Sequence, residues 1–242
     1  MAGNPIRGSR YLLRGIKMLA EPGLRPFIIV PLLINCLLFS VAIYLLSQYF
    51  SDWMASWLAM IPDWLGFIDW LLWPVFALLL LIGVYFSFAL FANFIAAPFN
   101  GLLSERVEQR QRGIRCTDDG WKEFLASIPA ALLREASKWL YYLPRLVILL
   151  LLSWVPLIGP LLWFLFGAWM MAIQFCDYPM DNNRITFGQM KKLLKQQRLS
   201  ALGFGGLVSL AMLVPLLNLL IMPAAVIGAT LFWVEEYSDS AV

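Results

Sequence analysis

One short stretch of the chain has side chains and backbone groups that suit an oxyanion. Glu21-Pro-Gly-Leu-Arg-Pro26 stands directly before a long apolar run. Proline and glycine at a helix start leave backbone N–H groups without partners, and the helix dipole adds partial positive charge there. With the guanidinium of Arg25, these groups could hold a tetrahedral oxyanion. The alternative is a helix cap followed by one arginine that marks the cytoplasmic side of a membrane.

Four asparagines interrupt otherwise apolar sequence. Asn35, Asn93 and Asn218 lie within apolar blocks, and Asn100 stands at the end of one. An amide that is buried without a partner costs a few kcal/mol, so we expect these side chains to face each other, water or a solute. Two interpretations stay open: a shared polar lining, or structural hydrogen bonds between helices.

A charged helical run follows the second apolar block. In Glu105-Arg-Val-Glu-Gln-Arg-Gln-Arg112, the spacing of Glu108 and Arg112 predicts an i,i+4 ion pair in the favourable order. Arg106 and Arg110 have the same spacing, which places like charges on one face. Two aligned arginines could attract an anion at a cytoplasmic vestibule, whereas most such runs are only solvated helix faces.

Residues for catalysis or metal binding are scarce. The sequence has no His, no Walker A loop and no GxSxG motif. Cys36, Cys116 and Cys176 form no CxxC pair, and we expect them to be buried, inert thiols. We therefore predict that the protein is not an enzyme and uses neither a cofactor nor a metal.

The elements that position these residues belong to a membrane protein. Hydrophobic residues make up 61% of the 242 residues and charged residues 14%, which is too few charges to cover a soluble domain. Residues 27–50 and 71–99 are each long enough to cross about 30 Å of hydrocarbon, and the second should extend beyond it. The basic N-terminus lacks the pattern of a removable signal peptide.

The positions of the Lys and Arg residues predict the topology. All 18 lie outside residues 26–105, and eight of them fall within residues 100–145. The positive-inside rule therefore places residues 100–145 and 177–200 in the cytoplasm. The net charge of +3 is too small to suggest a nucleic-acid partner.

Two further apolar blocks, residues 146–176 and 201–234, are broken by prolines. Two full crossings would need about 40 residues, and one unbroken crossing about 20. Pro156 and Pro160 interrupt the first block, and Pro215 and Pro223 the second. A helical hairpin that enters the membrane partway and returns to the same face fits the length of each block, its prolines and the charged residues at both of its ends. Such hairpins suggest a path for a polar solute. We thus predict one all-α membrane domain over residues 1–242, with two long transmembrane helices, two partially inserted helical hairpins and cytoplasmic amphipathic helices.

Several long motifs resemble the CysZ-type sulfate permeases of the bacterial inner membrane, from Pro22 to about Tyr237. They are Ile95-Ala-Ala-Pro-Phe-Asn-Gly-Leu-Leu-Ser-Glu105, Trp163-Phe-Leu-Phe-Gly-Ala-Trp-Met-Met-Ala-Ile-Gln174, Cys176-Asp-Tyr-Pro-Met-Asp-Asn182 and Pro215-Leu-Leu-Asn-Leu-Leu-Ile-Met-Pro223. The resemblance implies sulfate uptake for assimilation and cysteine synthesis, by a multi-pass protein that assembles as a homo-oligomer in membrane lipid. A non-transporting scaffold or assembly factor is the alternative.

The resemblance also implies roles for particular residues. Its sulfate-binding motif falls on Gly23, Leu24 and Arg25. Many relatives carry a second basic residue after this arginine, where the present chain has Pro26. Its pathway and gate positions fall on Asn35, Asn93, Asn100, Glu105, Arg106, Arg110 and Asn218.

Overall fold

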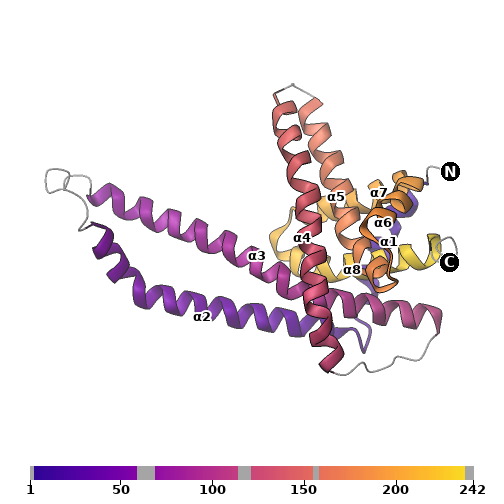
Figure 1. The fold of residues 1–242 in the computed structure, drawn as a ribbon, viewed down its shortest axis with the longest axis horizontal. Coiled ribbons are helices and arrows are strands. Elements are labelled where there is room, and N and C mark those ends of the chain that lie inside the picture. Colours follow the sequence, from indigo (N-terminus) through magenta and orange to yellow (C-terminus); the bar gives the residue numbers. More distant parts are fainter. Residues whose placement is uncertain (1–2, 59–68, 114–120, 155–157, 238–242) are drawn as a thin grey trace. The chain divides into compact units, whose positions relative to one another are not determined.

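The computed structural model describes residues 3–58, 69–113, 121–154 and 158–237, and these residues form helices and no strands. Within these ranges, the side chains of residues 85–95 and 121–127 are among those that it does not describe. The helices are α1 (Pro5–Met18), α2 (Arg25–Leu58), α3 (Asp69–Arg112), α4 (Trp121–Leu152), α5 (Ile158–Asn182), α6 (Phe187–Gln196), α7 (Arg198–Ala211) and α8 (Pro215–Glu236). Figure 1 shows them in chain order.

The chain divides into two compact units. The first comprises Met1–Ile29 and Ala97–Val242. The second comprises Val30–Ala96, which contains α2 from Val30 to its end and α3 from its start to Ala96. In the second unit, α2 exposes many large apolar side chains, among them Leu33 and Leu37 at 62% and 64%. Exposure of so much apolar surface to water is unfavourable, whereas the hydrocarbon core of a bilayer accommodates it.

Two helical stretches among the described residues are long and apolar enough to cross a membrane. They are Arg25–Leu46 and Gly159–Asn182. The first matches the predicted span at residues 27–50. The second predicted span, at residues 71–99, falls on α3, where many side chains lie outside the described set. The predicted all-α membrane fold is confirmed at this level, whereas partial insertion of the hairpins stays a prediction.

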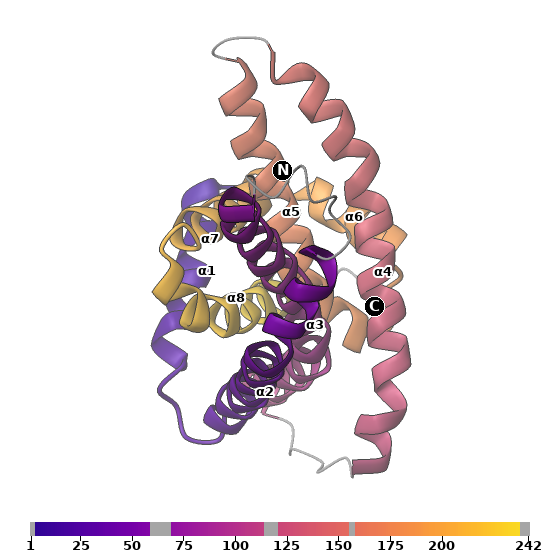
Figure 2. The ribbon, with the colours of Figure 1, turned by 90° about the vertical axis from the view of Figure 1, so that its left-hand side faces the viewer.

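The core of the first unit forms where α1, α5, α7 and α8 pack together (Figure 2). Glycines let these backbones come close. A Cβ at Gly8 of α1 would collide with the backbone oxygen of Ser200 on α7, and a Cβ at Gly205 of α7 would collide with that of Ala168 on α5. Aromatic side chains fill the space beside them, as where Phe232 of α8 contacts other rings of the core. Because α1 begins with an Asn4 cap and a proline in its first turn, its start is also locally encoded.

Both proline-broken blocks are bent in the structure. The α4 helix ends at Leu152 and α5 begins at Ile158, and the two helices run side by side in Figure 1. Pro156 lies outside the described residues. The second break lies at residues 212–214, and Pro215 opens α8, while Pro223 lies inside α8 without ending it. Proline in the first turn lacks only an N–H that the helix does not use.

One prediction about the cysteines is wrong. Cys176 is buried in the core of the first unit, as expected, but Cys36 is exposed. It lies on α2 among apolar side chains that no other described part of that unit covers. Cys116 lies outside the described residues.

Candidate functional site

The loop between α1 and α2 has a shape that its residues dictate. Residues 21–25, termed the 21–25 loop, form the second part of the connection between α1 and α2 and include Arg25, the first residue of α2. Gly23 has a φ of 93°, which a residue with a Cβ adopts only with strain. Leu24 is 2% exposed and contributes to the core of the first unit. The glycine therefore makes the turn, and the leucine anchors it.

Arg25 is held at the mouth of this loop. Its Nε and Nη2 atoms donate hydrogen bonds of 3.2 and 2.7 Å to the backbone oxygen of Ala20. The side chain stays exposed, at the N-terminal end of α2 where the helix dipole is positive. Guanidinium has five N–H donors, and Nη1 is not engaged in these bonds. This arrangement can bind an anion that approaches the loop.

The charged end of α3 lies against the same loop. Nη1 of Arg110 is 3.1 Å from Oε2 of Glu21. That carboxylate oxygen is shielded from solvent without an aligned hydrogen bond, so the contact is an ion pair. The guanidinium of Arg106 lies over the ring of Phe27 in the first turns of α2, at 5.9 Å. The structure thus brings Arg106 and Arg110 together with the 21–25 loop.

The predicted ion pair within this run is confirmed. Nη2 of Arg112 lies 2.8 Å from Oε1 of Glu108. The same carboxylate accepts hydrogen bonds from Asn183 and from the indole of Trp233, at 2.8 and 3.2 Å. Glu108 therefore ties α3 to α5 and α8, which is a structural role. Glu105 accepts a 3.0 Å hydrogen bond from Gln109.

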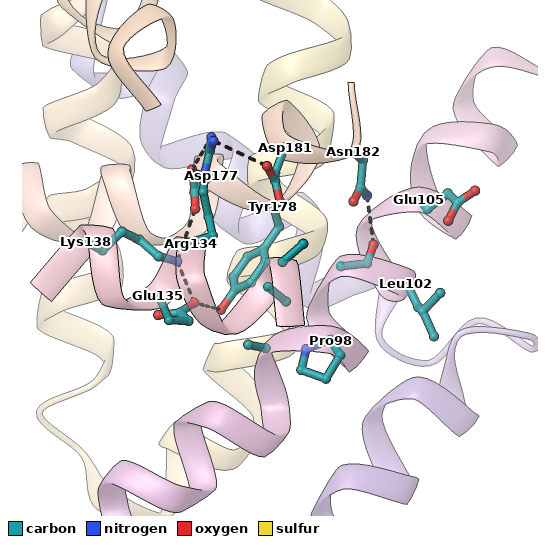
Figure 3. A pocket seen from close by; sticks show the side chains of 14 residues that line it. Pro98, Leu102, Glu105, Arg134, Glu135, Lys138, Asp177, Tyr178, Asp181 and Asn182 are labelled. Atoms are coloured by element: carbon teal, nitrogen blue, oxygen red, sulfur yellow. Dashed lines mark hydrogen bonds and ion pairs between the residues drawn. The ribbon is translucent and has the colours of Figure 1, made fainter. Parts of the chain in front are cut away.

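A cavity of about 220 Å³ opens between α3, α4 and α5, with Glu105 and Tyr178 among the residues that line it (Figure 3). The Asn100 amide donates a 3.3 Å hydrogen bond to the hydroxyl of Tyr178. That hydroxyl in turn donates to Oε1 of Glu135, also at 3.3 Å. Asn100 is therefore joined to a network of α4 and α5 at the cavity wall.

A buried charged network surrounds Lys138, which is 1% exposed. Its Nζ lies 2.6 Å from Glu135 and 3.3 Å from Asp177, and Arg134 bonds Asp177 from the other side at 2.8 Å. Burial opposes the charge of Lys138. The neighbouring Tyr178, Asp177 and Glu135 outweigh burial and hold the pKa of Lys138 above its usual value. The amine therefore stays charged throughout the physiological range.

This cavity has an excess of negative charge. Six ionisable residues with four carboxylates and two cations line it: Glu105, Glu135, Asp177, Asp181, Arg134 and Lys138. With all six ionised, two positive charges against four negative ones give a formal charge of −2. A dianion is favoured less there than beside the 21–25 loop, where Arg25, Arg106 and Arg110 outnumber the carboxylate of Glu21.

Sequence reasoning missed the network around Lys138. Arg134 and Lys138 are four residues apart on α4, and Asp177 and Asp181 are four apart on α5. These two matched spacings predict that each pair lies on one helix face. The pairing itself depends on the bend between α4 and α5, which brings Lys138 to Asp177.

Two of the remaining asparagines have a shielded amide oxygen without a partner among the described residues. Asn35 is in the second unit, and its Oδ1 is shielded without a partner among the described residues. The Oδ1 of Asn218, in the first turn of α8, is in the same state. The side chain of Asn93 lies outside the described set. Two amide oxygens that lack partners fit the predicted polar lining, which stays a prediction.

No cluster of three or more His, Cys, Asp or Glu side chains that could hold a metal ion occurs in the part of the chain that the structure describes.

Comparison with known proteins gives near full-length matches. Residues 11–223 match the family described as sulfate transporter CysZ/etoposide-induced protein 2.4. A protein of Pseudomonas paraeruginosa named sulfate transporter CysZ is 48% identical over 98% of both chains. A protein of the same name from Pseudomonas syringae pv. tomato is 46% identical over 100% of this chain and 97% of its own. Another, from Vibrio parahaemolyticus, is 44% identical over 95% of both chains.

Proposed function

This chain belongs to the sulfate transporter CysZ/etoposide-induced protein 2.4 family, and from this membership we propose that it carries sulfate across the membrane. The observation that carries the proposal is the identity of 44–48% to proteins named sulfate transporter CysZ along nearly the whole length of both chains. The same membership argues against an enzyme.

Capture of sulfate is assigned to Gly23, Leu24 and Arg25. Three properties support this: the backbone of the 21–25 loop turns at Gly23, the helix dipole of α2 points its positive end at the loop, and the Arg25 guanidinium is exposed there. Charged hydrogen bonds of this kind are about twice as strong as neutral ones. Pro26 replaces the second basic residue of many relatives, so Arg25 must provide most of the charge.

Release from the loop is assigned to the end of α3. Glu21 competes with sulfate for Arg110, because both are anions within reach of the same guanidinium. A transported ion has to leave as well as bind, so modest affinity is a requirement. We therefore assign Arg110 and Arg106 to a gate beside the loop, with Glu105 next to them on α3.

The sulfate path itself must stay wet. A dianion without water or aimed donors would cost tens of kcal/mol in hydrocarbon. Asn35, Asn93, Asn100 and Asn218 are proposed to line that path. The Oδ1 atoms of Asn35 and Asn218 lack hydrogen-bond partners among the described residues, which supports a partner from elsewhere, such as water or the solute, for those two.

The cellular setting is proposed on the same basis. The chain is placed in the bacterial inner membrane with several spans, where imported sulfate supplies assimilation and cysteine synthesis. A homo-oligomer in contact with lipid would cover the apolar side chains that α2 exposes.

The function is tested by reconstitution of the purified full chain in liposomes. With a tenfold inward gradient, labelled sulfate should enter these liposomes faster than protein-free ones, and unlabelled sulfate should compete. A homogeneous, folded protein that gives no sulfate influx under any imposed gradient would contradict transport and favour a scaffold.

A further inference from the structure

Two cations of the first unit stack on one tyrosine. The Cζ atom of Arg145 on α4 lies 3.5 Å from the ring centroid of Tyr141, and Nζ of Lys191 on α6 lies 4.5 Å from the same ring. Lys191 is also 4.5 Å from the ring of Phe187, whose edge contacts Tyr141 at 5.6 Å. Cation–π contacts therefore hold both charges beside one aromatic surface.

The donors of Arg145 remain suited to an oxyanion. Stacking uses the face of the guanidinium, and Nη1 donates a 2.7 Å hydrogen bond to the backbone oxygen of Tyr141. The other edge of the guanidinium carries Nε and Nη2, which can bind two oxygens of a phosphate group at once. Since the side chain of Arg145 is exposed, such a ligand can reach it.

The position of this pair along α4 indicates what the ligand is. Directly after Arg145 the helix exposes only apolar side chains, such as Val147 at 55% and Leu151 at 71%. Just before it, Leu140 and Leu143 are exposed at 75% and 51%. An exposed arginine beside tyrosine, with exposed apolar side chains before and after it on the helix, is typical of the headgroup level of a bilayer.

The charged residues of helix α6 and of the part of α4 around Arg145 are all basic. Helix α6 carries Lys191, Lys192 and Lys195 and contains no acidic residue. Residues 139–152 of α4 contain Arg145 and no acid either. These two segments together carry four cations, and each basic residue near a membrane surface favours anionic lipid.

We propose that Arg145 and Lys191, stacked on Tyr141, bind the phosphate of an anionic phospholipid headgroup. The acyl chains of that lipid would lie along the apolar face of α4 beyond Arg145. This site is distinct from the 21–25 loop, since it is formed by α4 and α6. A lipid bound at this site would fix how deeply the bend between α4 and α5 lies relative to the headgroups. The proposal does not depend on sulfate transport.

The test is lipid retention by the purified full chain in native mass spectrometry, with phosphatidylglycerol and phosphatidylcholine offered at equal concentration. The wild-type chain should retain phosphatidylglycerol preferentially. The double variant Arg145→Ala, Lys191→Ala should bind phosphatidylglycerol about thirtyfold more weakly, because each basic residue near a membrane surface contributes about 1 kcal/mol to binding of anionic lipid. The matched control, Arg10→Ala with Lys17→Ala, removes one exposed Arg and one exposed Lys from α1 and should retain the preference.

A second variant separates the site from a general loss of charge. Tyr141→Leu keeps both cations but removes the ring that orders them, and it should also lower the preference for phosphatidylglycerol. Equal retention of both lipids by the wild-type chain, or an unchanged preference in the double variant, would overturn the proposal. Displacement of phosphatidylglycerol by inorganic phosphate at millimolar concentration would instead identify a site for free phosphate and overturn the lipid assignment.

Discussion

Nη1 of Arg110 lies 3.1 Å from Oε2 of Glu21, so an ion pair joins the end of α3 to the loop that precedes α2. The two side chains are 89 positions apart in the sequence. The two side chains are 51% and 32% exposed, although Oε2 of Glu21 itself is shielded from solvent. An anion that reaches the 21–25 loop therefore meets an arginine whose charge is already partly compensated.

Replacement of Glu21 by Gln should strengthen sulfate binding. The substitution removes a competing anion and keeps the size of the side chain, so Arg110 becomes available to sulfate. Because the pair is partly exposed, we expect a gain of about two- to fivefold in affinity. Isothermal titration with sulfate measures this, and Arg110→Ala should change affinity in the opposite direction. Weaker binding by Glu21→Gln would show that Glu21 supports the site instead of competing with the ligand.

Replacement of Gly205 by Ala should destabilise the first unit. The added Cβ would collide with the backbone oxygen of Ala168, which cannot rotate away. We expect a loss of about 1–3 kcal/mol, as for other overpacked positions. Gly188→Ala is the matched control, since its Cβ would meet nothing within 4 Å in helix α6. Thermal unfolding in detergent should lower Tm for the first variant only; an equal Tm for both would contradict close packing of α5 and α7.

Replacement of Lys138 by Met should cost on the order of 3 kcal/mol in stability. It leaves Glu135 and Asp177 buried with one fewer cation. Adding Glu135→Gln removes one of these carboxylates, so the double variant should be more stable than Lys138→Met alone. A double-mutant cycle on unfolding free energies measures this coupling. Strict additivity would show that the pair does not interact in the folded protein.

The contribution of Glu235 should depend on pH. The hydrogen bond from Arg14 is the main cause that holds the pKa of Glu235 below its usual value. A lowered pKa gives stability that is present above the unfolded pKa of 4.5 and is lost as pH falls through the folded pKa. Both side chains are partly exposed, so the gain should stay below about 1 kcal/mol. The Tm difference between wild type and Glu235→Gln should therefore be positive at pH 6 and should shrink below pH 4.5.

The positions of the Lys and Arg residues and of the prolines predicted much of the architecture. The apolar run after Arg25 forms α2, and the break at Pro215 separates α7 from α8, because both features are encoded in adjacent residues. The pair of Glu108 and Arg112 was predictable for the same reason, since its spacing is one helical turn.

Long-range packing was not predictable from local patterns. The sequence of α1 indicates only a polar, basic N-terminal segment, yet its Tyr11 and Leu12 are buried in the core. Its place depends on glycines that matter only once α7 and α8 lie against it. Similarly, the local sequence predicts only a cytoplasmic location for Lys138. Its burial could not be predicted, because its partner Asp177 is 39 residues away along the chain.

Sulfate flux through the Arg25→Ala variant tests the central claim most directly. The variant removes the guanidinium that stands at the mouth of the 21–25 loop, and Arg10→Ala, which removes another exposed arginine, serves as the control. A charged hydrogen bond to the ligand contributes about 1.5–3 kcal/mol, so sulfate binding should weaken by about tenfold or more. We predict that labelled sulfate influx into proteoliposomes at low sulfate concentration falls by a similar factor for Arg25→Ala and stays at the wild-type rate for Arg10→Ala. Influx through Arg25→Ala at the wild-type rate would contradict sulfate capture at this loop.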